Sequence, residues 1–144
     1  MPGDGLILAL ETSCDDTCAA VITADGEIRA NVISSQGVHD RFGGVVPEIA
    51  SRQHLTLLPA LIAEALRGAD ATLDQVGLVA ATRGPGLVAA LLVGFCAGKS
   101  LAAARQLPFA PVDHLHGHLA ASFLQPSRFE PPFLALIASG SAKK

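Results

Sequence analysis

A chain of 144 residues, half of them hydrophobic and 16% charged, is long enough for one domain with its own core, and this composition excludes a disordered protein. The net charge of -3 at pH 7 provides no overall positive field, so contact with nucleic acid would need a local patch or a partner. Cys14, Cys18 and Cys96 form no C-x-x-C pair. This spacing argues against a disulfide framework and favours a reducing, cytoplasmic location.

The first third of the chain predicts an antiparallel meander. Residues 6–10 form a continuous apolar run, which is typical of a central strand buried on both faces. Turn-forming residues at 11–17 separate this run from a second strand at 18–23. A glycine-containing turn at 24–27 then leads to a third strand at 28–33. Strands joined by such short turns pair with each other in antiparallel fashion.

A helix is predicted from Pro47 to Gly68, because proline suits the first helical turn, glycine a helix end, and apolar residues recur between them at helical spacing. Pro59 lies inside this pattern and predicts a kink or a split into two helices. Near the helix start, Glu48, Arg52 and His54 either face a cleft or form the solvated side.

The second half of the chain alternates strands and helices. Strands are predicted at 76–82 and 109–112, and a further strand begins at 133–138. The Ala- and Gly-rich segment 87–107 predicts a helix buried against its neighbours, with Cys96 in the core. Lys99 interrupts the segment, so we expect no membrane span and no membrane partner. The whole pattern predicts an α/β fold: a mixed sheet, antiparallel meander plus parallel strands, with helices on its faces.

Three of the five histidines fall within residues 114–118. If this segment is helical, His114 and His118 lie one turn apart on one face, with Cβ atoms about 5–6 Å apart, and they could bind one zinc or iron ion. A solvated helix start explains the spacing equally well. His116 points to another face and is a bystander or a group that orients a ligand. Two imidazoles do not complete a metal site, which needs a third or fourth ligand.

Two turns could also carry chemistry. At the end of the first strand, Asp15 and Asp16 could orient water or a cation beside backbone N–H groups, although an ordinary hairpin tip is the simpler interpretation. The Gly-Pro-Gly turn at 84–86 could place a phosphate at a helix start, although a plain strand-to-helix turn is the more common explanation. No Walker motif follows it.

Four stretches, at 11–17, 43–54, 84–102 and 114–119, resemble in order and spacing the TsaD family, also called Gcp. Members of that family are tRNA N6-adenosine threonylcarbamoyltransferases. The resemblance covers residues 6–140. It implies an actin-like ATPase fold of two related lobes, each with a ribonuclease H-like sheet, and transfer of threonylcarbamoyl from threonylcarbamoyl-AMP to adenosine 37 of tRNA.

The resemblance also implies roles for individual residues. His114 and His118 would be two ligands of iron or zinc, and Asp15 and Asp16 the acidic pair near the transfer site. The start of the family's substrate-binding loop would correspond to Ile137, Ala138, Ser139, Gly140 and Ser141.

Three departures from the family pattern limit these expectations. His116 stands where relatives usually carry glutamate, the sequence diverges after Gly140, and the second lobe, with its metal-binding aspartate, is missing. We therefore expect residues 1–140 to form an N-terminal lobe and residues 141–144 to form a foreign or truncated tail. A lobe of this kind would hold a divalent metal weakly, would share the adenylate substrate or ATP/ADP with the missing lobe, and would be inactive alone.

The expected partners are tRNA, a TsaB-like paralogue with its associated ATPase subunit, or a second copy of the lobe. One alternative is a non-catalytic, dimerising TsaB-like lobe, but that paralogue lacks the histidine pair. Another is the carbamoyltransferase lobe of hydrogenase maturation, which also has a His-rich stretch. The turn at 11–16 and the loop at 43–48 argue against this second alternative.

Overall fold

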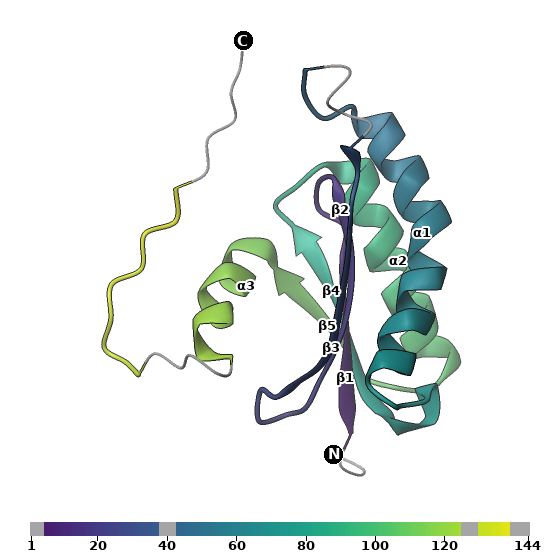
Figure 1. The fold of residues 1–144 in the computed structure, drawn as a ribbon, viewed down its shortest axis with the longest axis vertical. Helices are drawn as coiled ribbons and strands as arrows, with labels where there is room; N and C mark the ends of the chain where they lie inside the picture. The colour runs from purple at the N-terminus through teal and green to yellow at the C-terminus, as the bar shows by residue number, and fades with distance from the viewer. Residues whose placement is uncertain (1–4, 38–42, 125–129, 139–144) are drawn as a thin grey trace.

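A five-stranded sheet forms the centre of the computed structural model (Figure 1). The structure describes residues 5–37, 43–124 and 130–138. The strands of the sheet lie in the spatial order β3-β2-β1-β4-β5. They are β1 (Leu6–Glu11), β2 (Asp16–Ile22), β3 (Ile28–Ser35), β4 (Val76–Gly84) and β5 (Phe109–Asp113).

The pairing of the strands confirms the predicted mixed sheet. β1 pairs antiparallel with β2, and β2 antiparallel with β3, which gives the expected meander. β4 lies parallel to β1 on its other side, and β5 parallel to β4. β1 is therefore the central strand. The parallel strands β1, β4 and β5 end at the same edge of the sheet.

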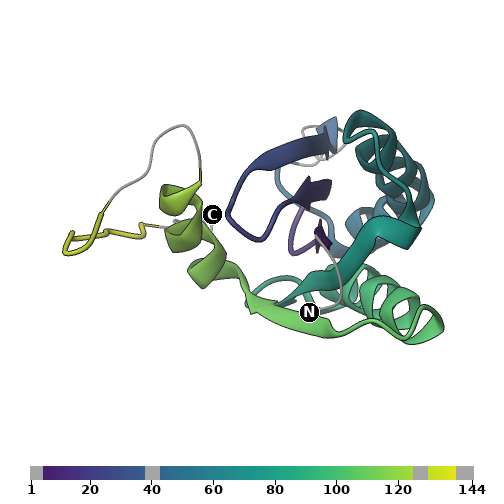
Figure 2. The same cartoon turned by 90° about the horizontal axis from the view of Figure 1, so that it is seen from below.

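Helices cover both faces of the sheet, as predicted (Figures 1 and 2). α1 (Pro47–Gly68) packs over β2 and β3, and α2 (Val88–Ala104) packs mainly over β4. The short α3 (His114–Ala120) lies on the opposite face and touches β4 and β5. Two single 3-10 turns, η2 (Leu73–Gln75) and η3 (Ala121–Phe123), complete the described elements.

The core lies between the sheet and the two long helices. Leu8 and Leu10 of β1 point into it and are almost fully buried, while Ile7 and Ala9 on the other face are only half-buried. The expectation that β1 is buried on both faces is therefore wrong for one face. The physical reason is that α3 is too short to cover that face as α1 and α2 cover the other.

The predicted split at Pro59 does not occur, because α1 runs as one helix from Pro47 to Gly68. Proline cannot donate to the carbonyl of Leu55, four residues earlier. Leu55 is 65% exposed and Pro59 is exposed too, so water can satisfy the carbonyl that loses its partner. The helix therefore continues through the proline.

α2 is buried on one face only. Gly94, Gly98 and Ala102 pack toward the sheet, whereas Val88 and Leu92 are 74% and 54% exposed. Cys96 follows them at the same helical spacing and is also exposed, so its predicted place in the core is wrong. An apolar sequence on every face of a helix does not show which face meets the sheet. In the described ranges, no helix combines the length and hydropathy needed to cross a membrane.

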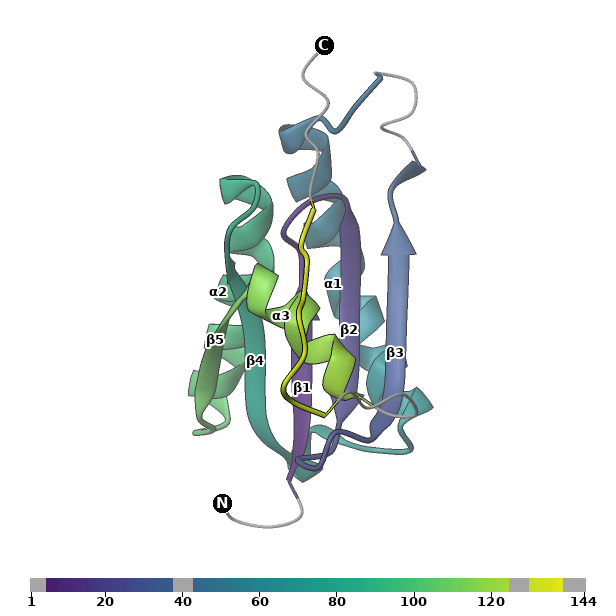
Figure 3. The same ribbon diagram turned by 90° about the vertical axis from the view of Figure 1, so that its left-hand side faces the viewer.

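The strand predicted at 133–138 is absent, since these residues have no regular secondary structure. Leu134 and Leu136 are 103% and 92% exposed. Figure 1 shows the segment, in yellow, beyond α3 on the side away from the sheet, and Figure 3 shows it running past α3. A strand forms only when a neighbour accepts its backbone hydrogen bonds, and α3 separates this segment from the sheet.

Candidate functional site

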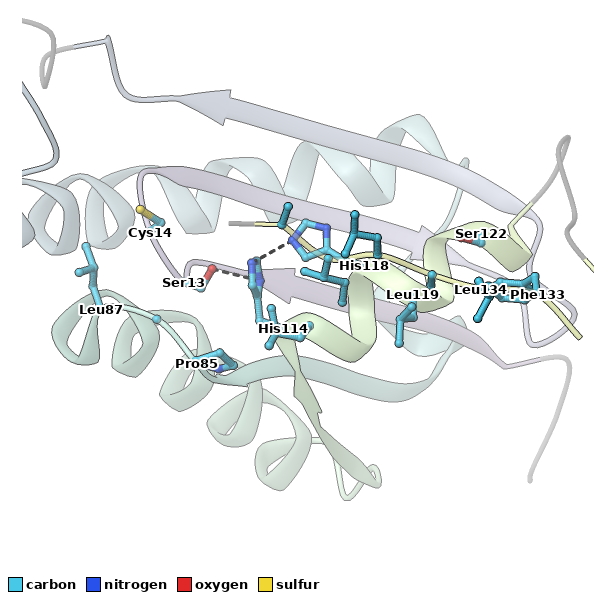
Figure 4. Close-up of a pocket in the computed structure, with 16 residues that line it drawn as sticks. Ser13, Cys14, Pro85, Leu87, His114, His118, Leu119, Ser122, Phe133 and Leu134 are labelled. Atoms are coloured by element: carbon cyan, nitrogen blue, oxygen red, sulfur yellow. Dashed lines mark hydrogen bonds between the residues drawn. The ribbon is translucent and has the colours of Figure 1, made fainter. Parts of the chain in front are cut away.

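A cleft of ≈ 970 Å³ opens at the sheet edge where the parallel strands end (Figure 4). In sheets of this type, ligands bind outside the carboxyl ends of the strands. The β1–β2 turn, the turn after β4, α3 and the segment 133–138 line the cleft. Because β1, β4 and β5 are parallel, residues far apart in the sequence meet here.

The β1–β2 turn packs directly against the start of α2. The N–H of Leu87 donates to the carbonyl of Ser13 at 2.8 Å. A Cβ atom on Gly86 would lie 2.6 Å from that same carbonyl oxygen, and one on Gly94 would lie 2.5 Å from the hydroxyl oxygen of Thr12. These two glycines are therefore needed for close packing. A phosphate at this turn stays a prediction.

The histidine stretch forms a helix, as predicted. The side chain of Asp113 caps it by accepting hydrogen bonds from the N–H groups of Leu115 at 2.9 Å and His116 at 3.3 Å. The bond from His116 holds the pKa of Asp113 below its usual value despite some desolvation. This cap fixes the first turn of α3 and hence the direction in which His114 leaves the strand.

His114 and His118 face each other across one turn of α3, and both line the cleft (Figure 4). Their Nε2 atoms are 3.1 Å apart. Two nitrogens bound to one zinc or iron ion at about 2.0–2.1 Å lie about 2.8–3.4 Å apart for octahedral to tetrahedral angles. The spacing and chemistry of the pair therefore fit a metal. Within the described part of the chain, no cluster of three or more His, Cys, Asp or Glu side chains could hold one, so the pair is half a site.

A polar cluster lies behind the histidine pair, centred on Glu11 at the end of β1. Its Oε2 atom accepts a hydrogen bond from the Thr82 hydroxyl at 2.6 Å and lies 3.0 Å from Nδ1 of His114. Its Oε1 atom accepts a hydrogen bond from the backbone N–H of Ser13. The hydroxyl oxygen of Ser13 lies 3.3 Å from Nδ1 of His114. Burial alone would raise the pKa of Glu11, but these hydrogen bonds outweigh it and the pKa is lowered.

The family model and the sequence relatives agree on one family. Residues 27–144 match the family model for TsaD, tRNA N6-adenosine threonylcarbamoyltransferase. The chain belongs to the TsaD family. It is 55% identical over 136 residues to the tRNA N6-adenosine threonylcarbamoyltransferase of Geobacter sulfurreducens and 48% identical over 136 residues to that of Clostridium perfringens. Each match covers 94% of this chain but only 40% of the relative, so the chain spans less than half the length of these relatives.

A solved structure of YeaZ from Pseudomonas aeruginosa has the same fold. It superposes with a TM-score of 0.62 at 23% sequence identity, over 83% of this chain and 48% of that one. A second structure, described as an uncharacterized protein with similarity to the peptidase YEAZ from the same organism, superposes equally well. The expected actin-like, ribonuclease H-like fold is thereby confirmed.

The acidic pair expected from the TsaD resemblance is not part of the cleft lining. Asp15, on the turn after Ser13, is half-buried, and Asp16, the first residue of β2, is exposed. Cys14, which precedes them in the sequence, does line the cleft. Burial and the charge of Asp15 raise the pKa of the Cys14 thiol, which disfavours its reactive thiolate form. The structure thus brings the turn, but not its two carboxylates, into the lining beside the histidines.

The segment expected to bind substrate is only partly described. Ile137 and Ala138 line the cleft opposite the histidine helix. Ser139, Gly140 and Ser141 lie outside the described residues. Their assignment to a substrate loop stays a prediction.

His54 occupies neither of the environments predicted for it, since its side chain is fully buried. Its Nε2–H donates to the carbonyl of Cys14 at 2.8 Å, and its Nδ1 is 2.7 Å from the hydroxyl oxygen of Thr17. His54 therefore joins α1 to both sides of the β1–β2 turn. A sequence signal existed: Ala50, His54, Leu58 and Leu61 follow the spacing of the buried face of α1. Glu48 and Arg52, by contrast, form an exposed ion pair at 2.8 Å.

Proposed function

We propose that this chain supplies the N-terminal lobe of a tRNA N6-adenosine threonylcarbamoyltransferase. The substrates would be threonylcarbamoyl-AMP and a tRNA with an adenosine at position 37. The observation that carries the proposal is the pair of imidazole nitrogens, 3.1 Å apart, on two side chains that line the cleft in a chain of the TsaD family. Since the chain spans 40% of the length of its relatives, the remaining groups would come from the rest of the enzyme.

His114 and His118 would hold one divalent metal, iron or zinc, through their Nε2 atoms, with a third ligand from the second lobe. A divalent metal in such a site stabilises negative charge on a carbonyl or phosphoryl oxygen. The open cleft beside the pair leaves room for a substrate oxygen, which a catalytic metal site requires.

The proposed reaction forms one carbon–nitrogen bond, breaks one carbon–oxygen bond and transfers one proton to a base. The N6 nitrogen of adenosine bonds to the carbamoyl carbon, the bond from that carbon to the phosphate oxygen breaks, and AMP leaves with the electron pair. The proton lost by N6 needs a base, and Asp15 and Asp16 are the candidates because they follow the turn that lines the cleft. When the second lobe closes, either these two carboxylates would turn toward the cleft or the tRNA would approach them.

Activity and metal content test this proposal on the chain itself. The purified chain should bind zinc and should not modify tRNA when given threonylcarbamoyl-AMP. Adding the remaining part of a relative as a separate chain should restore modification, and His114→Ala should prevent that restoration. Modification of tRNA by the chain alone, or unchanged metal content in His114→Ala, would contradict the proposal.

A TsaB-like paralogue, of the YeaZ type, is the proposed protein partner, together with its associated ATPase subunit. The outer surface of α1 and α2 suits this partner because Leu55, Val88 and Leu92 are exposed there and line or flank an apolar groove. A paralogue with the same fold could present an equivalent pair of helices. A tRNA substrate and three free cysteines favour a cytoplasmic location.

Leu92→Glu would test the partner surface. This variant should weaken association with a TsaB-like paralogue, measured by sedimentation, while zinc binding stays unchanged. Glu64→Gln, elsewhere on the exposed side of α1, is the matched control. Association of the chain only with itself would instead support the alternative of a dimerising lobe.

A further inference from the structure

We propose that Glu11 is a positioning residue for the metal-binding pair. Its carboxylate holds the ring proton of His114 on Nδ1, and this keeps Nε2 of that ring unprotonated and available to a metal in the cleft. The inference rests on the proposed function for its purpose, since it concerns the site that the histidines form. Its own claim, the position of one proton, can be tested without metal or activity.

The contacts of Glu11 determine where that proton lies. Oε2 of Glu11 is 3.0 Å from Nδ1 of His114. An ionised carboxylate can only accept hydrogen bonds, so this contact requires the proton on Nδ1. The Ser13 hydroxyl, 3.3 Å from the same nitrogen, can either donate or accept, so it does not decide the tautomer.

The other contacts of Glu11 hold its carboxylate in place. The Thr82 hydroxyl and the Ser13 N–H donate to its two oxygens, from the end of β4 and from the β1–β2 turn. Hydrogen bonding lowers the pKa of Glu11 against the opposing effect of burial, which agrees with an ionised acceptor. Both side chains of the Glu11–His114 pair are only about one-third exposed, at 31% and 30%. The pair is therefore partly shielded from competing water.

The consequence lies at the other nitrogen of the ring. With the proton on Nδ1, Nε2 carries the lone pair. Without a metal this atom lies 3.1 Å from Nε2 of His118, which can donate a hydrogen bond to it. The hydrogen bond made by one ring nitrogen sets the state of the other, and metal-bound histidines commonly donate their second N–H to a carboxylate. Glu11, at the end of β1, thus selects the tautomer of His114, at the start of α3, that can bind a metal through Nε2.

Glu11→Gln should reverse this selection. The N–H of Ser13 needs an oxygen acceptor, so the amide would place its oxygen there and its NH2 group toward Thr82 and His114. Nδ1 of His114 would then accept a hydrogen bond, and the proton would move to Nε2. Thr82→Val is the matched control, because it removes a bond to the same carboxylate without changing the acceptor that His114 meets.

Long-range proton–nitrogen NMR of the imidazole rings, recorded without metal at alkaline pH, reports the tautomer directly. We expect the proton of His114 on Nδ1 in the natural chain and in Thr82→Val, and on Nε2 in Glu11→Gln. Zinc titration followed at the same ring should show binding at least about tenfold weaker in Glu11→Gln than in Thr82→Val.

Three outcomes separate the possibilities. A proton on Nε2 in the natural chain would overturn the role of Glu11 without any variant. An unchanged tautomer in folded Glu11→Gln would overturn it as well. An Nδ1 proton in the natural chain with no response of His114 to zinc would support the role of Glu11 in setting the tautomer, and would overturn the proposed metal site instead.

Discussion

His54 and His114 belong to two polar regions on opposite sides of the same hairpin turn. His54 is fully buried, and its two ring nitrogens meet the Cys14 carbonyl and the Thr17 hydroxyl. His114 is partly exposed, and only its Nδ1 faces the inner polar cluster around Glu11. Its Nε2 faces His118 and the cleft.

This difference separates a structural histidine from a candidate ligand. When protein groups occupy both ring nitrogens, the side chain can fix a backbone but cannot bind anything else. When a carboxylate holds one nitrogen and the other meets only a second imidazole beside a cleft, the ring is oriented, and a metal can replace the contact between the two rings. The following variants test this contrast, in order of decreasing effect.

His54→Ala should lower the free energy of unfolding by about 2–4 kcal/mol, because it leaves a cavity and removes the partners of a buried hydroxyl and a carbonyl. Urea unfolding would measure the change. His118→Ala, at an exposed position, should change the same quantity by less than about 0.5 kcal/mol. Equal losses of unfolding free energy in the two variants would contradict a structural role for His54 that His118 lacks.

His118→Ala should instead weaken zinc binding by about 100-fold, because one of only two imidazoles is lost. Isothermal titration calorimetry with zinc alone would measure this. His54→Gln is a suitable comparison, since its ring nitrogens are already occupied. If zinc binding survived in His118→Ala, the pair would not be the metal site.

Lowering the pH should remove the contribution that Glu11 makes to the stability of the fold. The pKa of Glu11 is lowered in the folded chain, so its ionised form contributes stability above the ordinary glutamate pKa. That contribution should disappear as the pH falls through the ordinary value toward the lower folded one. Urea unfolding between neutral and acidic pH should therefore show a steeper loss of stability in the natural chain than in Glu11→Gln. Parallel curves would exclude this role.

His116→Gln should have the smallest effect. His116 is exposed and its side chain does not line the cleft, although it lies between the two candidate ligands in sequence. Unfolding free energy should change by less than about 0.5 kcal/mol, and zinc affinity should stay within about twofold. A large loss of zinc affinity would place His116 in the site and require a different ligand set.

The order of strands and helices could be predicted because it depends on local patterns. Apolar runs and turn residues located the five strands, and the spacing of histidines located α3 and its pair of facing rings. Of the kink or split predicted at Pro59, the split does not occur, because the effect of proline on α1 depends on whether the freed carbonyl meets water. Residues 133–138 misled the prediction for a similar reason, since a strand requires a neighbour that only the assembled fold can provide.

The polar contacts of Glu11 with Thr82 and His114 could not be predicted from the sequence, for a different reason. Glu11 lies 71 residues from Thr82 and 103 from His114 in the sequence, and no spacing rule connects them. Parallel pairing of β1, β4 and β5 brings their ends together and creates the cluster. His54 gave a weaker signal, because its position on the buried face of α1 was visible, but its partners across the turn were not.

Local patterns in the sequence were enough to predict most of the strands and helices and the two histidines one helical turn apart, because each is encoded within a short stretch of chain. The family followed from several such stretches in order. Three features could be read only from the folded chain: which face of α2 is buried, that residues 133–138 form no strand, and which nitrogen of His114 meets Glu11. These features depend on which surfaces and hydrogen-bonding groups the folded chain brings together, and distant parts of the chain supply them.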